Sequence, residues 1–262
     1  MKNLFFVLSM AVLLLAGCKK DEGNGFEPTK LGFGMFCEAH AQQADIIDCM
    51  DMLRHLDEYI AVSDEQRAVL HERYFRNTRI VELANIGCWV ITPNGSYYDV
   101  EIYTRGKGLG DEGAVWEVKI VTYDSYPYKR EHRSLSAEYA ADNTWALSLR
   151  KLDYTWGYET TSTADLTYKI LSASQVQIGG SGRLPFAEKV NYNDIDEDLY
   201  ADYTISKALV FDSDRDRFIS GSYDFRFVYD GSLHTPAAEY SNGQVTVYGG
   251  ENNAYNRTYW LY

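Results

Sequence analysis

Apolar and polar side chains alternate in short runs from about Arg79 to the end of the chain, and this period of two limits the possible folds more than any other feature. Successive side chains of a β-strand point to opposite faces, so alternation predicts strands with one buried and one solvated face. The longest run is Ile219 to Tyr229, in which aromatic residues alternate with Ser222, Asp224 and Arg226. We expect this strand to lie at the centre of a sheet.

Turn-forming dipeptides separate the alternating runs, as in Asn94-Gly95 and Asn242-Gly243. Asn and Gly tolerate the positive φ angles of the primed turns that join tight hairpins. About ten short strands follow one another without interposed helices, a pattern typical of an antiparallel meander. The sequence leaves open whether this β domain, over residues 79–262, closes as a barrel or folds over as a sandwich, and the hairpin spacing favours a barrel-like form.

A helical pattern precedes the β domain. Apolar residues between Glu38 and Ala61 recur at steps of three and four, which places them on one face of a helix. Ser63 with Gln66 three residues later forms a capping box that opens a second helix. The fold class is therefore mainly β, an antiparallel meander preceded by an N-terminal helical hairpin over residues 31–78 that packs on the β domain.

The segment from Met1 to Cys18 has the layout of a secretory signal. Lys2 gives a positive start, and the apolar run of Leu4 to Leu15 would span only roughly 18 Å as a helix, against about 30 Å for a hydrocarbon core. We therefore do not expect it to stay in the protein as a membrane span.

Leu15-Ala16-Gly17-Cys18 resembles the lipobox of bacterial lipoproteins. The resemblance implies that a signal peptidase recognises Leu15, Ala16 and Gly17, that residues 1–17 are removed, and that the thiol of Cys18 carries a diacylglyceryl group. Several acyl chains, palmitate among them, would then hold the protein durably, since one chain alone binds a membrane only marginally. The lipid would be the protein's only membrane contact.

Residues 18–30 read as a flexible tether because glycine and charged residues dominate its start. Lys19-Lys20-Asp21-Glu22 is similar to the export tag of surface-displayed lipoproteins in some Gram-negative anaerobes. We expect a lipid-anchored protein of the outer membrane of a Gram-negative bacterium. Its orientation, toward the periplasm or on the cell surface, stays open.

Charge and cysteine content narrow the possible partners and cofactors. The formal net charge is −13 and no Lys/Arg-rich block stands out, so nucleic acid is not an expected partner. Besides Cys18 the chain has Cys37, Cys49 and Cys88, an odd number in a compartment where disulfides persist. Cys88 could pair with either of the others, or all three could be buried thiols. No metal-binding spacing of Cys and His occurs, and we expect no metal and no cofactor.

Three segments resemble catalytic or metal-binding motifs, but each lacks residues that its motif requires. The glycines at 106, 108 and 110 lack the helix start that a phosphate loop needs, and Gly179 to Gly182 lacks the second flanking glycine of a nucleophile elbow. Asp212, Asp214 and Asp216 have calcium-loop spacing, but Arg217 and Tyr223 stand where that loop needs glycine and a bidentate acid. We therefore nominate no catalytic residue, although carboxylates from different strands could still meet.

A short stretch around residue 130 concentrates a few positive charges, although it is too small to count as a Lys/Arg-rich block. Tyr126 and Tyr128 lie beside Arg130 and Arg133, combining amphipathic rings with guanidinium groups. We nominate these four residues as a binding site for an anionic ligand.

The sequence thus predicts a lipid-anchored envelope protein that binds a glycan, a peptide or a partner protein without catalysis. A surface hydrolase of polymers that uses paired carboxylates is one alternative, and a structural or adhesive subunit is another. Two acids facing each other in a deep cleft would favour the enzyme, a groove of exposed rings the binding protein, and a long unpaired edge strand the assembly subunit.

Overall fold

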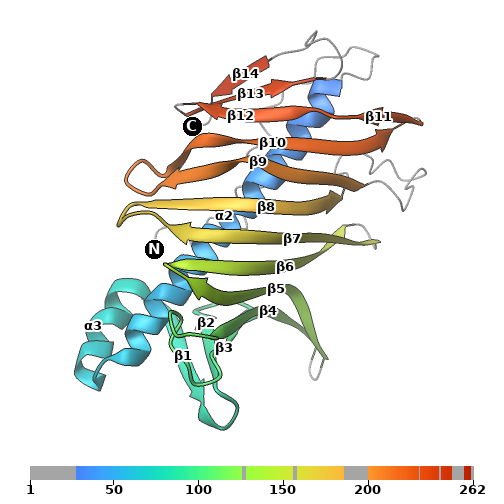
Figure 1. Cartoon of the computed structure of the whole chain (residues 1–262). Helices are drawn as coiled ribbons and strands as arrows, with labels where there is room; N and C mark the ends of the chain where they lie inside the picture. Colours follow the sequence, from blue (N-terminus) through green and yellow to red (C-terminus); the bar gives the residue numbers. More distant parts are fainter. Residues whose placement is uncertain are drawn as a thin grey trace. The chain divides into compact units, whose positions relative to one another are not determined.

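The structure is a computed structural model that describes residues 28–125, 128–155, 158–185, 200–229, 231–241, 243–249 and 257–260. Its helices are α2 (Pro28–Ala61), α3 (Asp64–Tyr74) and the 3₁₀ helix η1 (Ala84–Ile86) (Figure 1). The strands are β1 (Thr78–Leu83), β2 (Cys88–Pro93), β3 (Tyr98–Tyr103), β4 (Val115–Ser125), β5 (Tyr128–Ala141), β6 (Thr144–Thr155), β7 (Tyr158–Ile170), β8 (Gln175–Pro185), β9 (Tyr200–Asp212), β10 (Arg217–Tyr229), β11 (Ser232–His234), β12 (Ala237–Ser241), β13 (Gln244–Tyr248) and β14 (Arg257–Trp260).

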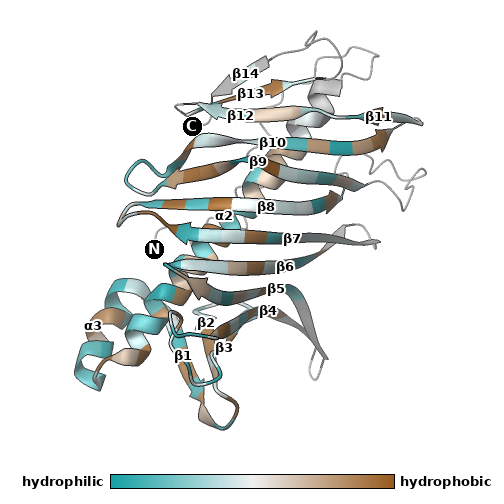
Figure 2. Cartoon of the chain, in the orientation of Figure 1, coloured by the Kyte–Doolittle hydropathy of each residue, from teal (hydrophilic) through white to brown (hydrophobic). Residues whose placement is uncertain are grey.

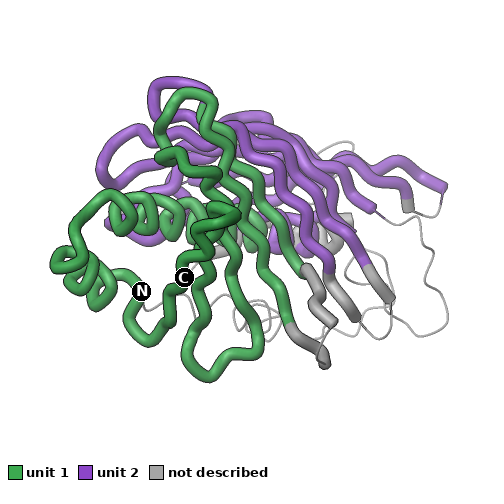
Figure 3. Tube along the Cα trace, turned by 90° about the horizontal axis from the view of Figure 1, so that it is seen from below, with its two compact units in different colours: residues 1–22, 41–139 green, residues 23–40, 140–262 purple. Residues whose placement is uncertain are grey.

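The predicted fold class, a mainly β antiparallel meander with N-terminal helices, is confirmed. The chain divides into two compact units: unit 1 contains residues 41–139, and unit 2 contains residues 23–40 and 140–262 (Figure 3). Within unit 1 the strand order is β1-β2-β3-β4-β5, and within unit 2 it is β6-β7-β8-β9-β10-β12-β13-β14, with β11 paired to β10. Among the described residues, no pairing joins the first and last strands of either unit, so each path is open.

Helix α2 begins at Pro28, ten residues before the start that the apolar stripe indicated. Its N-terminal part belongs to unit 2, where the buried Phe36 ring contacts the Tyr240 and Tyr223 rings with centroids 5.4 and 6.2 Å apart. Gly32 lets the helix approach the sheet closely, since a Cβ there would stand 2.9 Å from Cβ of Pro236. Packing against strands far along the chain thus extends the helix through a glycine-containing segment that local propensity disfavours.

His40 lies in the same packed region of unit 2. Its Nδ1 and the hydroxyl of Tyr240 share a hydrogen bond of 2.6 Å, and its ring lies 5.4 Å from the ring of Phe218. Burial lowers the pKa of His40 to about 4, because an imidazolium would lose its hydration among these rings. The side chain is therefore neutral at ordinary pH.

In unit 1, α2 and α3 form the predicted helical pair. The backbone N–H of Ser63 donates to Oε1 of Gln66 at 3.3 Å, as expected of the capping box. The Arg67 guanidinium donates to the carbonyl oxygens of Tyr59 and Ile60 at 3.1 and 3.0 Å. These carbonyls end α2 and have no partner within the helix, so α3 supplies their hydrogen bonds.

The turn between β2 and β3 differs from the prediction. The hairpin is present, but its loop covers residues 94–97, and only Gly95 has a positive φ, of 78°. The N–H of Ser96 donates to the Pro93 carbonyl at 3.1 Å, and the Ser96 hydroxyl donates to the same oxygen at 2.7 Å. Both primed turns need a positive φ at the first central residue, here Asn94, which does not have one, so that prediction was wrong. Asp142 and Asn143 adopt the two positive angles of a type I′ turn instead, with φ of 48° and 54°.

Alternate residues along the strands of unit 2 are buried and form one face of the sheet. Figure 2 shows apolar and polar bands following one another along these strands. Strand β10 lies between β9 and β12, and Tyr223, Phe225 and Phe227 are buried, so the predicted interior strand is confirmed. Their neighbours Asp224 and Arg226 are exposed. The aromatic side chains of this region thus serve mainly as core.

Strand β3 in unit 1 is covered on both faces, although apolar and polar residues alternate from Tyr98 to Thr104 and this pattern predicts a solvated Glu101. Only 7% of Glu101 is exposed, and the hydroxyl of Tyr103 donates to its Oε2 at 2.9 Å. Burial, reinforced by this carboxylate, raises the pKa of Tyr103. The carboxylate tolerates burial because it is hydrogen-bonded.

No disulfide joins Cys37, Cys49 and Cys88. Cys49 is buried, and burial raises the pKa of its thiol to about 11, so it stays protonated and unreactive.

Candidate functional site

The residues nominated from the sequence fall partly inside and partly outside the described residues. Leu15, Ala16, Gly17, Cys18 and Tyr126 lie outside the described residues. Tyr128 and Arg130 begin strand β5, in register with Ser125 and Thr122 of β4. They remain nominations from the sequence.

Arg133 is engaged inside unit 1. Its Nη2 lies 2.7 Å from Oδ2 of Asp45 on α2, and each of the two side chains is only 14% exposed. The positive charge of the same guanidinium favours the thiolate of Cys49 and partly offsets the larger effect of burial, which raises the pKa of that thiol. Arg133 therefore joins β5 to the helix through a largely buried ion pair.

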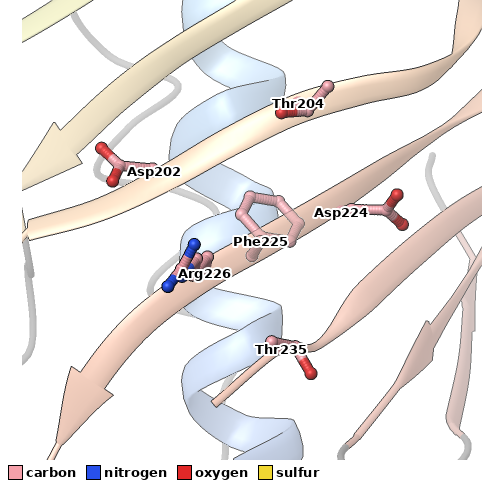
Figure 4. Close-up of a pocket in the computed structure, with 6 residues that line it drawn as sticks. All are labelled: Asp202, Thr204, Asp224, Phe225, Arg226 and Thr235. Carbon is pink, nitrogen blue, oxygen red and sulfur yellow. The ribbon is translucent and has the colours of Figure 1, made fainter. Parts of the chain in front are cut away.

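A depression of about 540 Å³ opens on the exposed face of the unit 2 sheet (Figure 4). Its polar lining consists of Asp202 and Thr204 from β9, Asp224 and Arg226 from β10, and Thr235, which follows β11. The buried Phe225 contributes to its floor. Volumes of about 300–1,000 Å³ are usual for small-molecule sites.

Strand register brings these residues together. Arg226 pairs with Asp202, and Asp224 pairs with Thr204, so the four side chains form a block of two residues by two on one face. On its other edge, β10 pairs with β12 through residues 220–224 and with β11 through residues 227–229. Between these two pairings, the N–H of Phe225 donates to the carbonyl of Pro236 at 2.8 Å. The interruption places Thr235 at the rim of the block.

The charges in the depression are only partly satisfied. Asp202 lies 3.9 Å from Nε of Arg183, whose guanidinium stands 4.7 Å from the centre of the Tyr200 ring. Within the described part of the chain, Asp224 and Arg226 form neither an ion pair nor a side-chain hydrogen bond. The depression therefore offers a carboxylate, a guanidinium and two threonine hydroxyls to a ligand.

The arrangement bears on catalysis and on metal binding. Asp202 and Asp224 line an open depression instead of facing each other across a deep cleft. Among the residues that the structure describes, no group of three or more His, Cys, Asp or Glu side chains could hold a metal ion. Hydrogen bonding is the chemistry that these groups supply.

Exposed aromatic rings would favour a ring-stacking binding groove, and a long edge strand would favour an assembly subunit. In unit 1 both features are small. In unit 1, Tyr97 is 71% exposed and meets the Tyr98 ring edge-on with centroids 6.4 Å apart, an isolated pair of rings. The edge strand β1 is short, and its exposed apolar residues are Val81 and Leu83. Neither forms an extended aromatic groove or a long flat edge.

Sequence reasoning placed Asp224 and Arg226 on a solvated face but did not find the site. Asp202 and Thr204 lie on another strand, and only the register of β9 with β10 brings them beside the first two residues. The alternation around residues 200–206 was the available signal, since it predicts an outward side for Asp202 and Thr204.

No protein-family model, curated protein or solved structure matches the chain. Across the described residues, no helix combines the length and the apolar character needed to cross a membrane.

Proposed function

We propose that this chain is a lipid-anchored outer-membrane protein that binds a glycan, without catalysis, in the depression formed by Asp202, Thr204, Asp224, Arg226 and Thr235. The observation that carries the proposal is the pair Asp224 and Arg226, an exposed carboxylate and guanidinium without side-chain partners of their own in the described chain. The anchoring part rests on the lipobox sequence ending at Cys18.

Sugar hydroxyl groups fit such a lining because each one both donates and accepts hydrogen bonds. A carboxylate accepts from two neighbouring hydroxyls, a guanidinium donates in a planar fork, and threonine does both. All five polar residues are exposed, so water competes for every bond. We therefore expect a weak complex, with a dissociation constant between about 1 μM and 1 mM.

The binding test uses the full-length lipoprotein in detergent micelles and a panel of neutral and acidic oligosaccharides, with calorimetry on every sugar that binds. Arg226→Ala and Asp224→Asn should each weaken binding by about tenfold, equivalent to about 1.4 kcal/mol. Lys169→Ala is the matched control, an exposed cation on the same sheet face outside the depression. Equal affinity of all four proteins, or no binding by any sugar, would refute the proposal.

A hydrolase is the second candidate because Asp202 and Asp224 line the same depression. Glycoside hydrolysis needs two carboxyl groups about 5–9 Å apart with one of them protonated. Incubating each bound oligosaccharide with the protein and measuring new reducing ends separates the two functions. Release that is abolished by Asp202→Asn would establish the enzyme in place of the binding protein.

The anchor is tested separately by metabolic labelling with radioactive palmitate. We expect the wild-type chain to incorporate label and the Cys18→Ser variant to lack it. Labelling of both proteins, or of neither, would exclude lipidation at Cys18. Protease treatment of intact cells then distinguishes a surface orientation from a periplasmic one.

A further inference from the structure

The depression is one end of a longer polar surface in unit 2. One row of paired residues crosses five strands in register and ends in the depression; its members are Arg150, Thr163, Arg183, Asp202 and Arg226. Every member is exposed. Because paired residues of neighbouring strands share a face, the row is continuous from β6 to β10.

A second row runs beside the first, and each of its members lies two residues from the first-row member on the same strand. Its members are Ser148, Asp165, Ser181, Thr204 and Asp224, and all of them are exposed. The two rows extend over four strand spacings, or about 19 Å at about 4.8 Å per spacing. The surface is therefore long enough for a ligand several times larger than the depression.

The side chains of the rows define the chemistry of that ligand. The charges cancel, because the two rows together contain three arginines and three aspartates, and the remaining members are serine and threonine. No member is apolar, so the surface offers nothing to a lipid or to the apolar side chains of a peptide. Strands β7 to β10 each pair with a neighbour on both sides, so an incoming peptide backbone cannot add to the sheet here either.

We propose that the ligand is an extended uncharged polysaccharide that crosses strands β6 to β10 along these two rows, an inference that rests on the proposed function. An extended sugar chain presents hydroxyls along both edges, and the length of one sugar ring is of the same order as the strand spacing of about 4.8 Å. Each sugar would therefore meet a new strand and a new pair of polar side chains. Binding strengthens with ligand length until the rows are filled.

The test compares neutral oligosaccharides of two to six sugars, taken from the series that binds the full-length lipoprotein most tightly. Arg150→Ala and Asp165→Asn alter β6 and β7, far from the depression, and both residues are exposed. Together they should weaken binding of the hexasaccharide at least fivefold and leave the disaccharide unchanged. Arg226→Ala should weaken both ligands, and Lys169→Ala neither.

Each result assigns failure to one proposal. If the Arg150 and Asp165 variants bind the hexasaccharide like wild type while Arg226→Ala weakens both ligands, the extended track is wrong and the depression stands. If Arg226→Ala also has no effect, the proposed binding site itself is wrong. Tighter binding of an acidic polymer than of a neutral one of equal length, with loss in 0.5 M salt, would overturn the uncharged class. Unchanged urea midpoints confirm that these surface variants fold.

Discussion

The ion pair between Asp45 and Arg133 provides the sharpest test of how unit 1 is held together. The two groups lie 2.7 Å apart and are 14% exposed, so both have lost most of their hydration. Arg133→Met removes one charge and leaves the Asp45 carboxylate buried without its counter-ion. Breaking a buried pair in this way costs about 3–5 kcal/mol.

The matched control is Arg105→Met. Arg105 also pairs with a carboxylate within unit 1, that of Glu117, but the two side chains are 62% and 34% exposed. Exposed pairs contribute about 0–1 kcal/mol because water screens them. The same substitution at the two positions therefore isolates the effect of burial.

Urea titrations and thermal melts followed by circular dichroism at pH 7.5 measure the stability of both variants, and hydrogen exchange in residues 41–61 reports on unit 1. Arg133→Met should lower the melting temperature by roughly 6–20 °C, at about 2–4 °C per kcal/mol. Adding Asp45→Leu should restore most of the loss, since the orphaned charge is then gone. A cost for Arg133→Met no larger than that for Arg105→Met would refute this reasoning.

Four further substitutions test the packing of α2. His40 has a pKa of about 4 in the folded state and 6.5 in the unfolded state, so the unfolded state binds the proton more tightly. The free energy of unfolding is therefore highest above pH 6.5 and falls by about 3 kcal/mol toward pH 4. His40→Gln should flatten this part of the pH profile of urea midpoints, and an unchanged slope would contradict it. Gly34→Ala should stabilise α2 by up to about 1 kcal/mol because its Cβ meets no atom within 4 Å, whereas Gly32→Ala should lower the melting temperature through contact with Pro236. Arg67→Ala should cost about 1–2 kcal/mol in urea unfolding by removing the hydrogen bonds at the end of α2, and a cost within error of zero would exclude that role.

The sequence predicted correctly those features that depend only on neighbouring residues in the chain. Alternation identified β10 and its buried face, because the period of a strand can be read in any single segment. The capping box at Ser63 and Gln66 likewise located the start of α3. These features need no knowledge of the rest of the chain.

Features that depend on distant residues were not predictable in this way. The segment from Pro28 to Glu38 is helical although Gly32 and Gly34 weaken it, because Phe36 packs on Tyr223 and Tyr240. Alternation could not indicate that both faces of β3 are covered.

The same limit applies to the candidate site. Whether Arg133 was available to a ligand depended on Asp45, which the basic stretch around residue 130 does not reveal. The depression required the register of β9 with β10, and pattern reasoning on single strands cannot supply the pairing that joins Asp202 to Arg226.

Unit 2 is built from two separate stretches of chain, 23–40 and 140–262, with His40 and Tyr240 in contact across 200 residues of sequence. Residues 41–139 are contiguous and are all synthesised before most of unit 2. The first stretch of unit 2, in contrast, cannot form its aromatic contacts until β12 has been synthesised. Such a high contact order makes closing unit 2 the slow step of folding. A chain truncated before Ala237 would leave Phe36 and His40 without Tyr240, and its helix exposed.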